Sequence, residues 1–231
     1  MNMKKFTQAS ALVASALFLT ACGSDDDGSS TATYSFTVKN LTHSQPLSPI
    51  GIVIHTDAFQ AWSIGESASI ALEELAEGGA NDNFVALDDS GKLESASGTG
   101  LLMSGSSETV EVSVTGSQDT LELSLATMLV NTNDAFAGVT GLDLAELDMD
   151  ESIEVVLPVY DAGTEENDEL VSTIPGQGGE GFSSDRTDLN KVARHPGVNG
   201  SDLADVEEPT SLTSAHRFDG PVARLTVTRL N

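Results

Sequence analysis

The chain contains 231 residues, of which 39% are hydrophobic, and its 36 acidic residues outnumber its 10 basic ones, so that the formal net charge is −26. This length suits one domain or two small ones, and the hydrophobic fraction is too high for a wholly disordered chain. The acidic balance argues against a protein that binds nucleic acid or an anionic membrane face through basic residues. It is typical of a self-repelling surface that attracts cations.

Residues 1–21 predict a bacterial lipoprotein signal peptide. Lys4 and Lys5 supply a positive start, and the apolar run Ala11–Leu19 is too short to span a bilayer. The run ends in the sequence Leu-Thr-Ala-Cys at residues 19–22, which resembles the lipobox of bacterial lipoproteins. In that family the cysteine is acylated and becomes the first residue of the mature protein, so Cys22 is the expected lipidation site. An ordinary secretory signal peptide is the alternative.

Two further features favour a lipid anchor. Cys22 is the only cysteine, so no disulfide competes for it, and residues 23–33 (GSDDDGSSTAT) form a polar stretch suited to a tether. Residues 22–33 are therefore expected to be a flexible linker. Gly23, in place of an aspartate, points to the outer membrane by the same resemblance. We expect a protein that is secreted across the inner membrane and held in the outer membrane by its lipid alone.

Alternation of apolar and polar residues predicts that most of the remaining chain is β-strand. The expected strands are Tyr34–Val38, Ile50–Ile54, Val110–Val114, Leu121–Val130, Ile153–Tyr160 and Val222–Leu230, with weaker candidates at Leu101–Met103 and Leu170–Ile174. Six to eight short strands with turns between them favour an antiparallel sandwich. We therefore predict one all-β domain of about eight strands over residues 34–231, with long acidic loops at 161–188 and 194–220.

One short helix is predicted near residues 68–77. Apolar residues recur there at helical spacing, Ser67 or Ser69 can cap the start, and glycines at 78 and 79 can end it. The acidic residues of this segment are expected to face solvent: Glu73, Glu74 and Glu77.

Motifs for catalysis are weak in this sequence. The histidines show no paired spacing for zinc on a helix, no Gly-x-Ser-x-Gly turn is present, and no glycine-rich phosphate-binding pattern occurs. We predict that the protein is not an enzyme. A hydrolase that uses His195 or His216, which lie in the second long loop, is the least favoured alternative.

Acidic residues follow two of the predicted strands. Asn131–Asp134 ends the strand 121–130, and Asp161–Glu165 ends the strand 153–160. If both strands belong to one sandwich, the two loops can emerge at the same end. Carboxylate, amide and backbone oxygens from two loops are the donors that Ca²⁺ prefers. The alternative is that these loops are ordinary solvated surface.

The residues 124–138 (SLATMLVNTNDAFAG) resemble the central motif of the spondin N-terminal domain. Tyr160–Glu165, His195–Gly197 and Pro221–Leu230 match further features of that family in order, and the resemblance covers roughly residues 34–230. It implies a C2-like antiparallel β-sandwich. In animals this domain belongs to matrix and adhesion proteins, and the bacterial relatives are secreted or lipid-anchored.

The resemblance also implies a calcium site. The acidic positions of the family's site fall on Asp134, Asp161 and Glu165, and the last is a departure because the animal domain has Asp there. Ala135 stands where the animal domain often has Trp, so the resemblance does not extend a shared partner surface to this chain. We therefore expect a lipid-anchored, calcium-binding module of the cell envelope that mediates adhesion to a protein or glycan. A structural envelope protein with a purely stabilising metal is the second reading.

Overall fold

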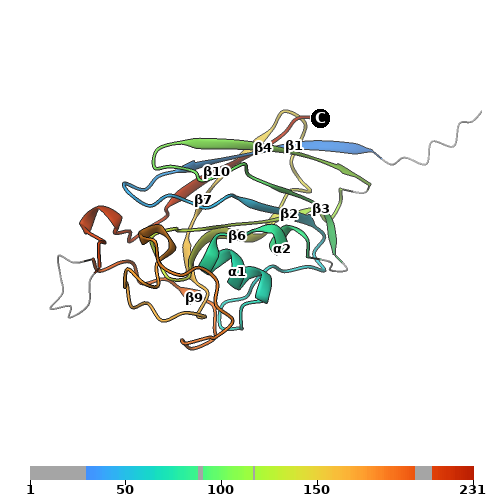
Figure 1. Cartoon of the computed structure of the whole chain (residues 1–231). Coiled ribbons are helices and arrows are strands. Elements are labelled where there is room, and N and C mark those ends of the chain that lie inside the picture. The colour runs from blue at the N-terminus through green and yellow to red at the C-terminus, as the bar shows by residue number, and fades with distance from the viewer. Residues whose placement is uncertain (1–29, 88–90, 117, 201–209) are drawn as a thin grey trace, which may run out of the picture.

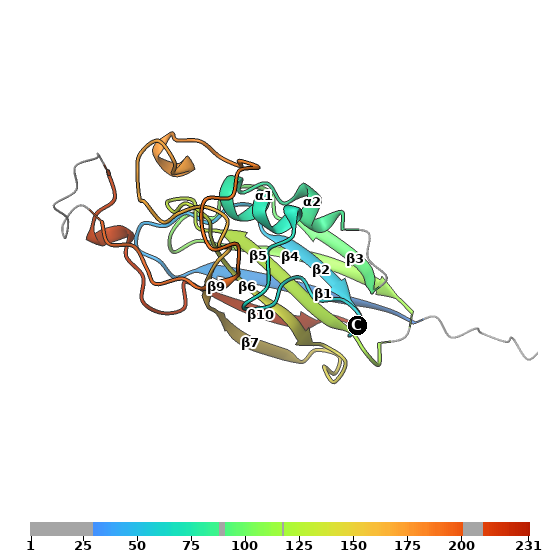
Figure 2. The ribbon, with the colours of Figure 1, turned by 90° about the horizontal axis from the view of Figure 1, so that it is seen from below.

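The computed structural model describes residues 30–87, 91–116, 118–200 and 210–231. In these residues the chain forms ten strands in two antiparallel sheets that lie face to face, with two short α-helices against one of the sheets (Figure 1). Seen from below, the helices cover the outer face of the larger sheet (Figure 2). The prediction of an all-β sandwich is confirmed.

The four-stranded sheet has one buried and one solvated face. Its strands lie in the order β4 (Ser107–Thr115), β1 (Thr31–Asn40), β10 (Ala223–Arg229) and β7 (Ser152–Leu157). Burial alternates along β1 and β10, which is the pattern that the sequence shows. β1 begins at Thr31, so it includes the last three residues of the expected tether.

The six-stranded sheet is buried on both faces at its central strands β2 (Gly51–His55) and β5 (Glu122–Met128). Its order is β3 (Lys92–Ser97), β2, β5, β6 (Ala135–Asp143), β8 (Val159–Asp161) and β9 (Ala193–Arg194). One face packs on the other sheet, and the other face packs on α1 (Ile70–Gly78) and α2 (Asp82–Val85). All five residues of β2 are buried, which explains why that strand is a continuous apolar run.

Two hydrophobic clusters stabilise this arrangement. The larger one lies between the sheets and includes Tyr34, Phe36 and Leu123. The smaller one lies between the six-stranded sheet and the helices, where the ring of Trp62 is 5.0 Å from that of Phe136 and the Phe136 ring is 5.3 Å from that of Tyr160. This second cluster fixes the ends of β6 and β8, from which the acidic loops leave.

The predicted strand 153–160 is divided by Pro158. Because proline lacks a backbone N–H, it interrupts a strand ladder. The residues before it form β7 in one sheet, and the residues after it form β8 in the other. The chain therefore crosses between the sheets at this point, and Asp161 is delivered to the larger one.

Further segments, including α2 and β9, differ from the sequence prediction. The strands β3 and β6 were not predicted, and β6 is interrupted by glycines that obscure its alternation. A Cβ at Gly138 would lie 2.3 Å from the Leu125 carbonyl oxygen, so close packing requires glycine there. The candidate strand 101–103 contributes only the bridge of Leu102 to Leu47, and the candidate 170–174 is a turn that leads into the 3₁₀ helix η1 (Pro175–Gln177).

The helix α1 is capped as expected, but its acidic side, which was predicted to face solvent, is partly buried. The Ser69 hydroxyl accepts from the Leu72 N–H at 3.2 Å, and Gly79 ends the helix with φ +69°. The prediction that its acidic residues face solvent is wrong for Glu73 and Glu77, which are 0% and 1% exposed. The loop that follows β8 lies over them.

The expected signal peptide, Cys22 and residues 23–29 of the tether lie outside the described residues. Within the described part of the chain, no helix is long and apolar enough to cross a membrane.

Candidate functional site

The two acidic loops meet at one end of the six-stranded sheet. β6 pairs with β8 so that Ala135 lies opposite Asp161, and the Ala162 N–H donates to the Asp134 carbonyl oxygen at 3.3 Å. The turn before β6 and the loop after β8 are therefore neighbours, as expected for two loops at one end of a sandwich, although the strand β6 that pairs with β8 was not predicted.

Asp134 is the most enclosed carboxylate of this region. Its side chain is fully buried, and Oδ2 accepts from the Thr164 N–H at 2.8 Å, the Glu165 N–H at 3.1 Å and the Thr164 hydroxyl at 3.2 Å. Among the described residues, Oδ1 has no hydrogen-bond partner. Burial, and then the negative charge of Asp161, raise the pKa of Asp134 to about 7. This oxygen thus has no compensating hydrogen-bond donor among the described residues.

Asp161 stands beside Asp134 and has partners on both oxygens. Oδ1 accepts from the Gly163 N–H at 2.7 Å, and Oδ2 accepts from the Asn167 side-chain amide at 2.6 Å. Burial raises the pKa of Asp161, and these two hydrogen bonds oppose the rise. The turn needs glycine at 163, because φ is +69° and a Cβ would lie 2.3 Å from the Lys191 carbonyl oxygen.

Glu165 completes the predicted set. It is half-buried, and burial followed by the charges of Glu77 and Asp134 raises the pKa of its carboxyl to about 8, with smaller contributions from Asp168 and Glu180. The structure therefore brings Asp134, Asp161 and Glu165 into one acidic region. Glu77 of α1, which was predicted to face solvent, also borders this region.

Side-chain hydrogen bonds hold the loop after β8 against the turn before β6. The Asn133 amide donates to Asp168 Oδ1 and to the Thr173 hydroxyl, both at 3.0 Å, and the Gln177 amide donates to Asn131 Oδ1 at 2.6 Å. Residues 131–134 are all less than 10% exposed. These residues are therefore not solvated surface, which was the alternative reading.

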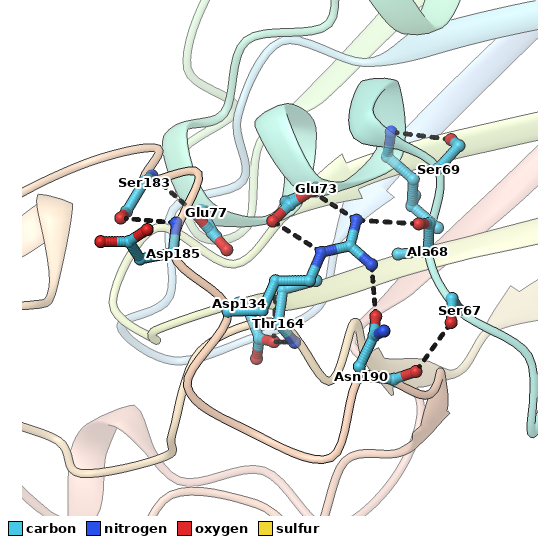
Figure 3. Close-up of polar contacts among 12 residues, drawn as sticks. Ser67, Ala68, Ser69, Glu73, Glu77, Asp134, Thr164, Ser183, Asp185 and Asn190 are labelled. Atoms are coloured by element: carbon cyan, nitrogen blue, oxygen red, sulfur yellow. Dashed lines mark hydrogen bonds and ion pairs between the residues drawn. The ribbon is translucent and has the colours of Figure 1, made fainter.

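The opposite side of the same loop is attached to α1. Figure 3 shows Glu73 and Glu77 on the side of the helix that faces Ser183 and Asp185. The Ser183 N–H donates to Glu77 Oε2 at 2.8 Å, and Arg186 forms an ion pair with Glu73. The loop 161–188 is thus fixed both to the helix and to the sheet.

The donor chemistry fits a hard cation such as Ca²⁺, because the side chains that gather here offer oxygen and one of them has a buried oxygen without a partner. Over residues 30–87, 91–116, 118–200 and 210–231, no three His, Cys, Asp or Glu side chains are grouped closely enough to hold a metal ion. Calcium also accepts backbone carbonyl and side-chain amide oxygens as ligands. The unpartnered oxygen of Asp134 is a buried acceptor that a cation can coordinate.

The two histidines of the second long loop have structural partners. His195 Nδ1 accepts from the Gly197 N–H at 3.0 Å, which leaves Nε2 to donate to Asn167 Oδ1 at 2.9 Å. Burial lowers the pKa of His195 to about 4, so the ring is neutral at pH 7. It lines a cavity of about 380 Å³ with Arg194 and Phe218. His216 Nδ1 accepts from the Thr213 N–H at 3.0 Å within a capped turn.

A serine–histidine pair that the sequence did not indicate lies inside the domain. His55 Nε2 is 2.8 Å from the Ser124 hydroxyl, and Nδ1 is 2.8 Å from the Thr56 carbonyl oxygen. Both side chains are 0% exposed. The pair therefore acts as a satisfied polar contact of the core and is not a nucleophile open to substrate.

The chain matches one known protein family over more than half of its length. The family model described as Spondin_N matches residues 33–175, which is more than half of the chain. The chain belongs to the Spondin_N family. The match runs from β1 to the first residue of η1 and includes Asp134, Asp161 and Glu165, whereas β9 and β10 lie beyond it. No curated protein matches the chain.

Proposed function

We propose that this Spondin_N protein is a lipid-anchored module of the cell envelope that binds Ca²⁺ through Asp134, Asp161 and Glu165 and presents the adjoining loops to a protein or glycan partner. The observation that carries the proposal is the buried, unpartnered Oδ1 of Asp134 among further carboxylates. A buried charge without a partner is costly, and a bound cation removes that cost.

The metal would supply positive charge and oxygen coordination at a place where the protein has gathered negative charge. Asp134 belongs to the turn before β6, whereas Asp161 and Glu165 belong to the end of β8 and the loop after it. A cation held by all three ties these segments together. A surface that is ordered before the partner arrives loses less entropy on binding, so calcium favours recognition at this end of the sandwich.

Calcium titration of the purified protein tests the proposal. We expect one saturable site by isothermal titration calorimetry and a calcium-dependent rise in melting temperature, with a smaller effect of Mg²⁺, which demands tighter geometry. Asp134→Asn and Asp161→Asn should abolish the calcium-specific response. Glu111→Gln is the matched control. It also removes one negative charge, but Glu111 is exposed on β4, away from the proposed site. Absence of a saturable site in the wild-type protein would refute the proposal.

A structural envelope role, with a metal that only stabilises the fold, is the second candidate. The many hydrogen bonds that already hold the loop 161–188 favour it. Binding arrays of matrix proteins and glycans, run with calcium and with EDTA, separate the two. Calcium-dependent capture of a defined ligand supports the recognition role, and calcium binding with no ligand in either condition supports the structural role.

The hydrolase alternative has less physical support. Both ring nitrogens of His195 are engaged, so its imidazole has no free lone pair to act as a general base in this arrangement. A broad esterase, peptidase and glycosidase screen tests the alternative directly. Activity that is lost in His195→Ala or His216→Ala would contradict the proposal that the protein is not an enzyme.

A further inference from the structure

Glu77 resembles Asp134 in one unusual respect. It lies in the last turn of α1 and is 1% exposed, and its Oε2 accepts from the Ser183 N–H at 2.8 Å. Its Oε1 has no hydrogen-bond partner in the part of the chain that the structure describes. Two of the buried side-chain oxygens that lack a partner are thus carboxylate oxygens, one on the helix and one on the turn before β6.

These two carboxylates face the same threonine. The Thr164 hydroxyl donates to Asp134 Oδ2 at 3.2 Å, and it is also near enough to the Glu77 carboxyl to oppose the rise in the pKa of that group. Since a hydroxyl has a single proton, it cannot donate to both at once. Glu165 is near both groups, because the charges of Glu77 and Asp134 each act on it. The helix therefore borders the acidic region formed by Asp134 and Glu165.

The protein itself supplies little positive charge to Glu77. Arg186, the nearby cation, donates two hydrogen bonds to the carboxylate of Glu73, and its effect on Glu77 is the smallest of those that act there. The end of a helix also carries the negative pole of the helix dipole, which disfavours a carboxylate in the last turn. The environment of Glu77 thus lacks the compensation that a buried carboxylate requires.

We infer that Glu77 is a further ligand of the cation site, so that the metal joins helix α1 to the turn before β6 and to the loop after β8. This inference rests on the proposed calcium site and extends it from two loop segments to three elements. The ligand class is an oxygen-preferring divalent cation, for which Ca²⁺ is the probe. Binding at the site would then secure the helix as well as the loops.

Calorimetric titration with Ca²⁺ of Glu77→Gln and Glu66→Gln tests the inference. Glu66→Gln is the matched control, because it removes one negative charge at an exposed position that precedes α1 in the chain. Loss of an outer-shell partner alone costs about 10- to 100-fold in metal affinity, so Glu77→Gln should weaken calcium binding at least about tenfold and leave the control unchanged. In EDTA, Glu77→Gln should not melt below the wild type, because an uncompensated buried charge has been removed.

The outcomes distinguish this inference from the proposed function. If the wild type has no calcium site, the proposed function fails and the inference fails with it. If the wild type and Glu77→Gln bind calcium equally, Glu77 is not a ligand, whereas the assignment of Asp134, Asp161 and Glu165 stands.

A measurement on the unmodified protein guards against a variant that does not fold. Amide hydrogen exchange with and without Ca²⁺ should show slower exchange at the end of α1, near residues 76–79, together with slower exchange at residues 161–165. Slower exchange confined to the loop residues would overturn the inference.

Discussion

Arg186 and Glu73 are 113 residues apart along the chain and form a two-point contact, in which Arg186 Nε donates to Glu73 Oε1 at 3.0 Å and Nη2 donates to Oε2 at 2.5 Å. Nη2 also donates to the Ala68 carbonyl oxygen, and Nη1 donates to the Asn190 side chain. Because Glu73 is fully buried, this contact compensates its charge and attaches the loop 161–188 to α1. The acidic region is enclosed as a result.

Removal of Arg186 should destabilise the protein strongly. Arg186→Gln leaves the carboxylate of Glu73 buried without its partner, a loss of about 3–5 kcal/mol. Arg224→Gln is the control, since the Arg224–Glu154 pair is exposed, with side-chain exposures of 42% and 56%, and such pairs contribute about 0–1 kcal/mol. Urea unfolding gives the free energy of unfolding of both variants. The double variant Arg186→Gln with Glu73→Gln should regain part of the loss, and equal effects of Arg186→Gln and Arg224→Gln would contradict this account.

Metal-free protein should lose stability as the pH rises from about 4 to about 8. Asp and Glu in the unfolded chain have pKa values near 4, whereas the pKa of Asp134 is about 7 and that of Glu165 is about 8 in the fold. The folded state therefore holds more protons than the unfolded state in this range, and stability falls as these are released.

Only the upper part of this pH range, above about 6.5, separates the carboxylates from His195. The lowered pKa of His195 acts in the opposite sense, because the unfolded chain binds the proton first, and stability from this group rises with pH between about 4 and about 6.5. Urea unfolding in EDTA at several pH values between about 6.5 and about 8 measures the effect of the carboxylates without that of His195. Asp134→Asn should flatten the dependence, and a wild-type stability that rises over this range would refute the assignment.

Deletion of β10 should prevent cooperative folding. The strand lies between β1 and β7 and pairs with both, and its Leu225 and Val227 are fully buried between the sheets. Each such side chain contributes about 1.5–3 kcal/mol, and the loss would also expose the ladders of two neighbouring strands. A truncation after Gly220 that still melts in one cooperative transition near the wild-type temperature would show that β10 is dispensable.

Lipidation at Cys22 is tested in cells of a bacterial host. Metabolic labelling with an alkyne palmitate should tag the wild type but not Cys22→Ser, because an acyl chain requires the thiol. The variant should also appear in the fraction that is free of membrane. Equal labelling of both proteins would remove the anchor from the proposed function and leave the calcium site unaffected.

The strands with one solvated face and the helix caps could be predicted from the sequence, because local periodicity and capping chemistry record the environment of each residue directly. Alternation located β1, β4 and β10, and Ser69 and Gly79 mark the ends of α1. Asp134 and Asp161 were expected to lie together because they follow the predicted strands 121–130 and 153–160, whereas the pairing that joins them is that of β8 with β6, a strand that was not predicted.

Only the tertiary structure decided which surfaces are covered. The acidic side of α1 has the pattern of a solvated face, yet Arg186 and Ser183, more than 100 residues later, bury Glu73 and Glu77 beneath a loop without regular alternation. The division of a continuous strand pattern at Pro158 likewise depended on the presence of two sheets to receive the halves. Periodicity reports how a residue alternates with its neighbours, whereas the burial of a charge depends on which distant segment packs against it and on the partner that this segment brings.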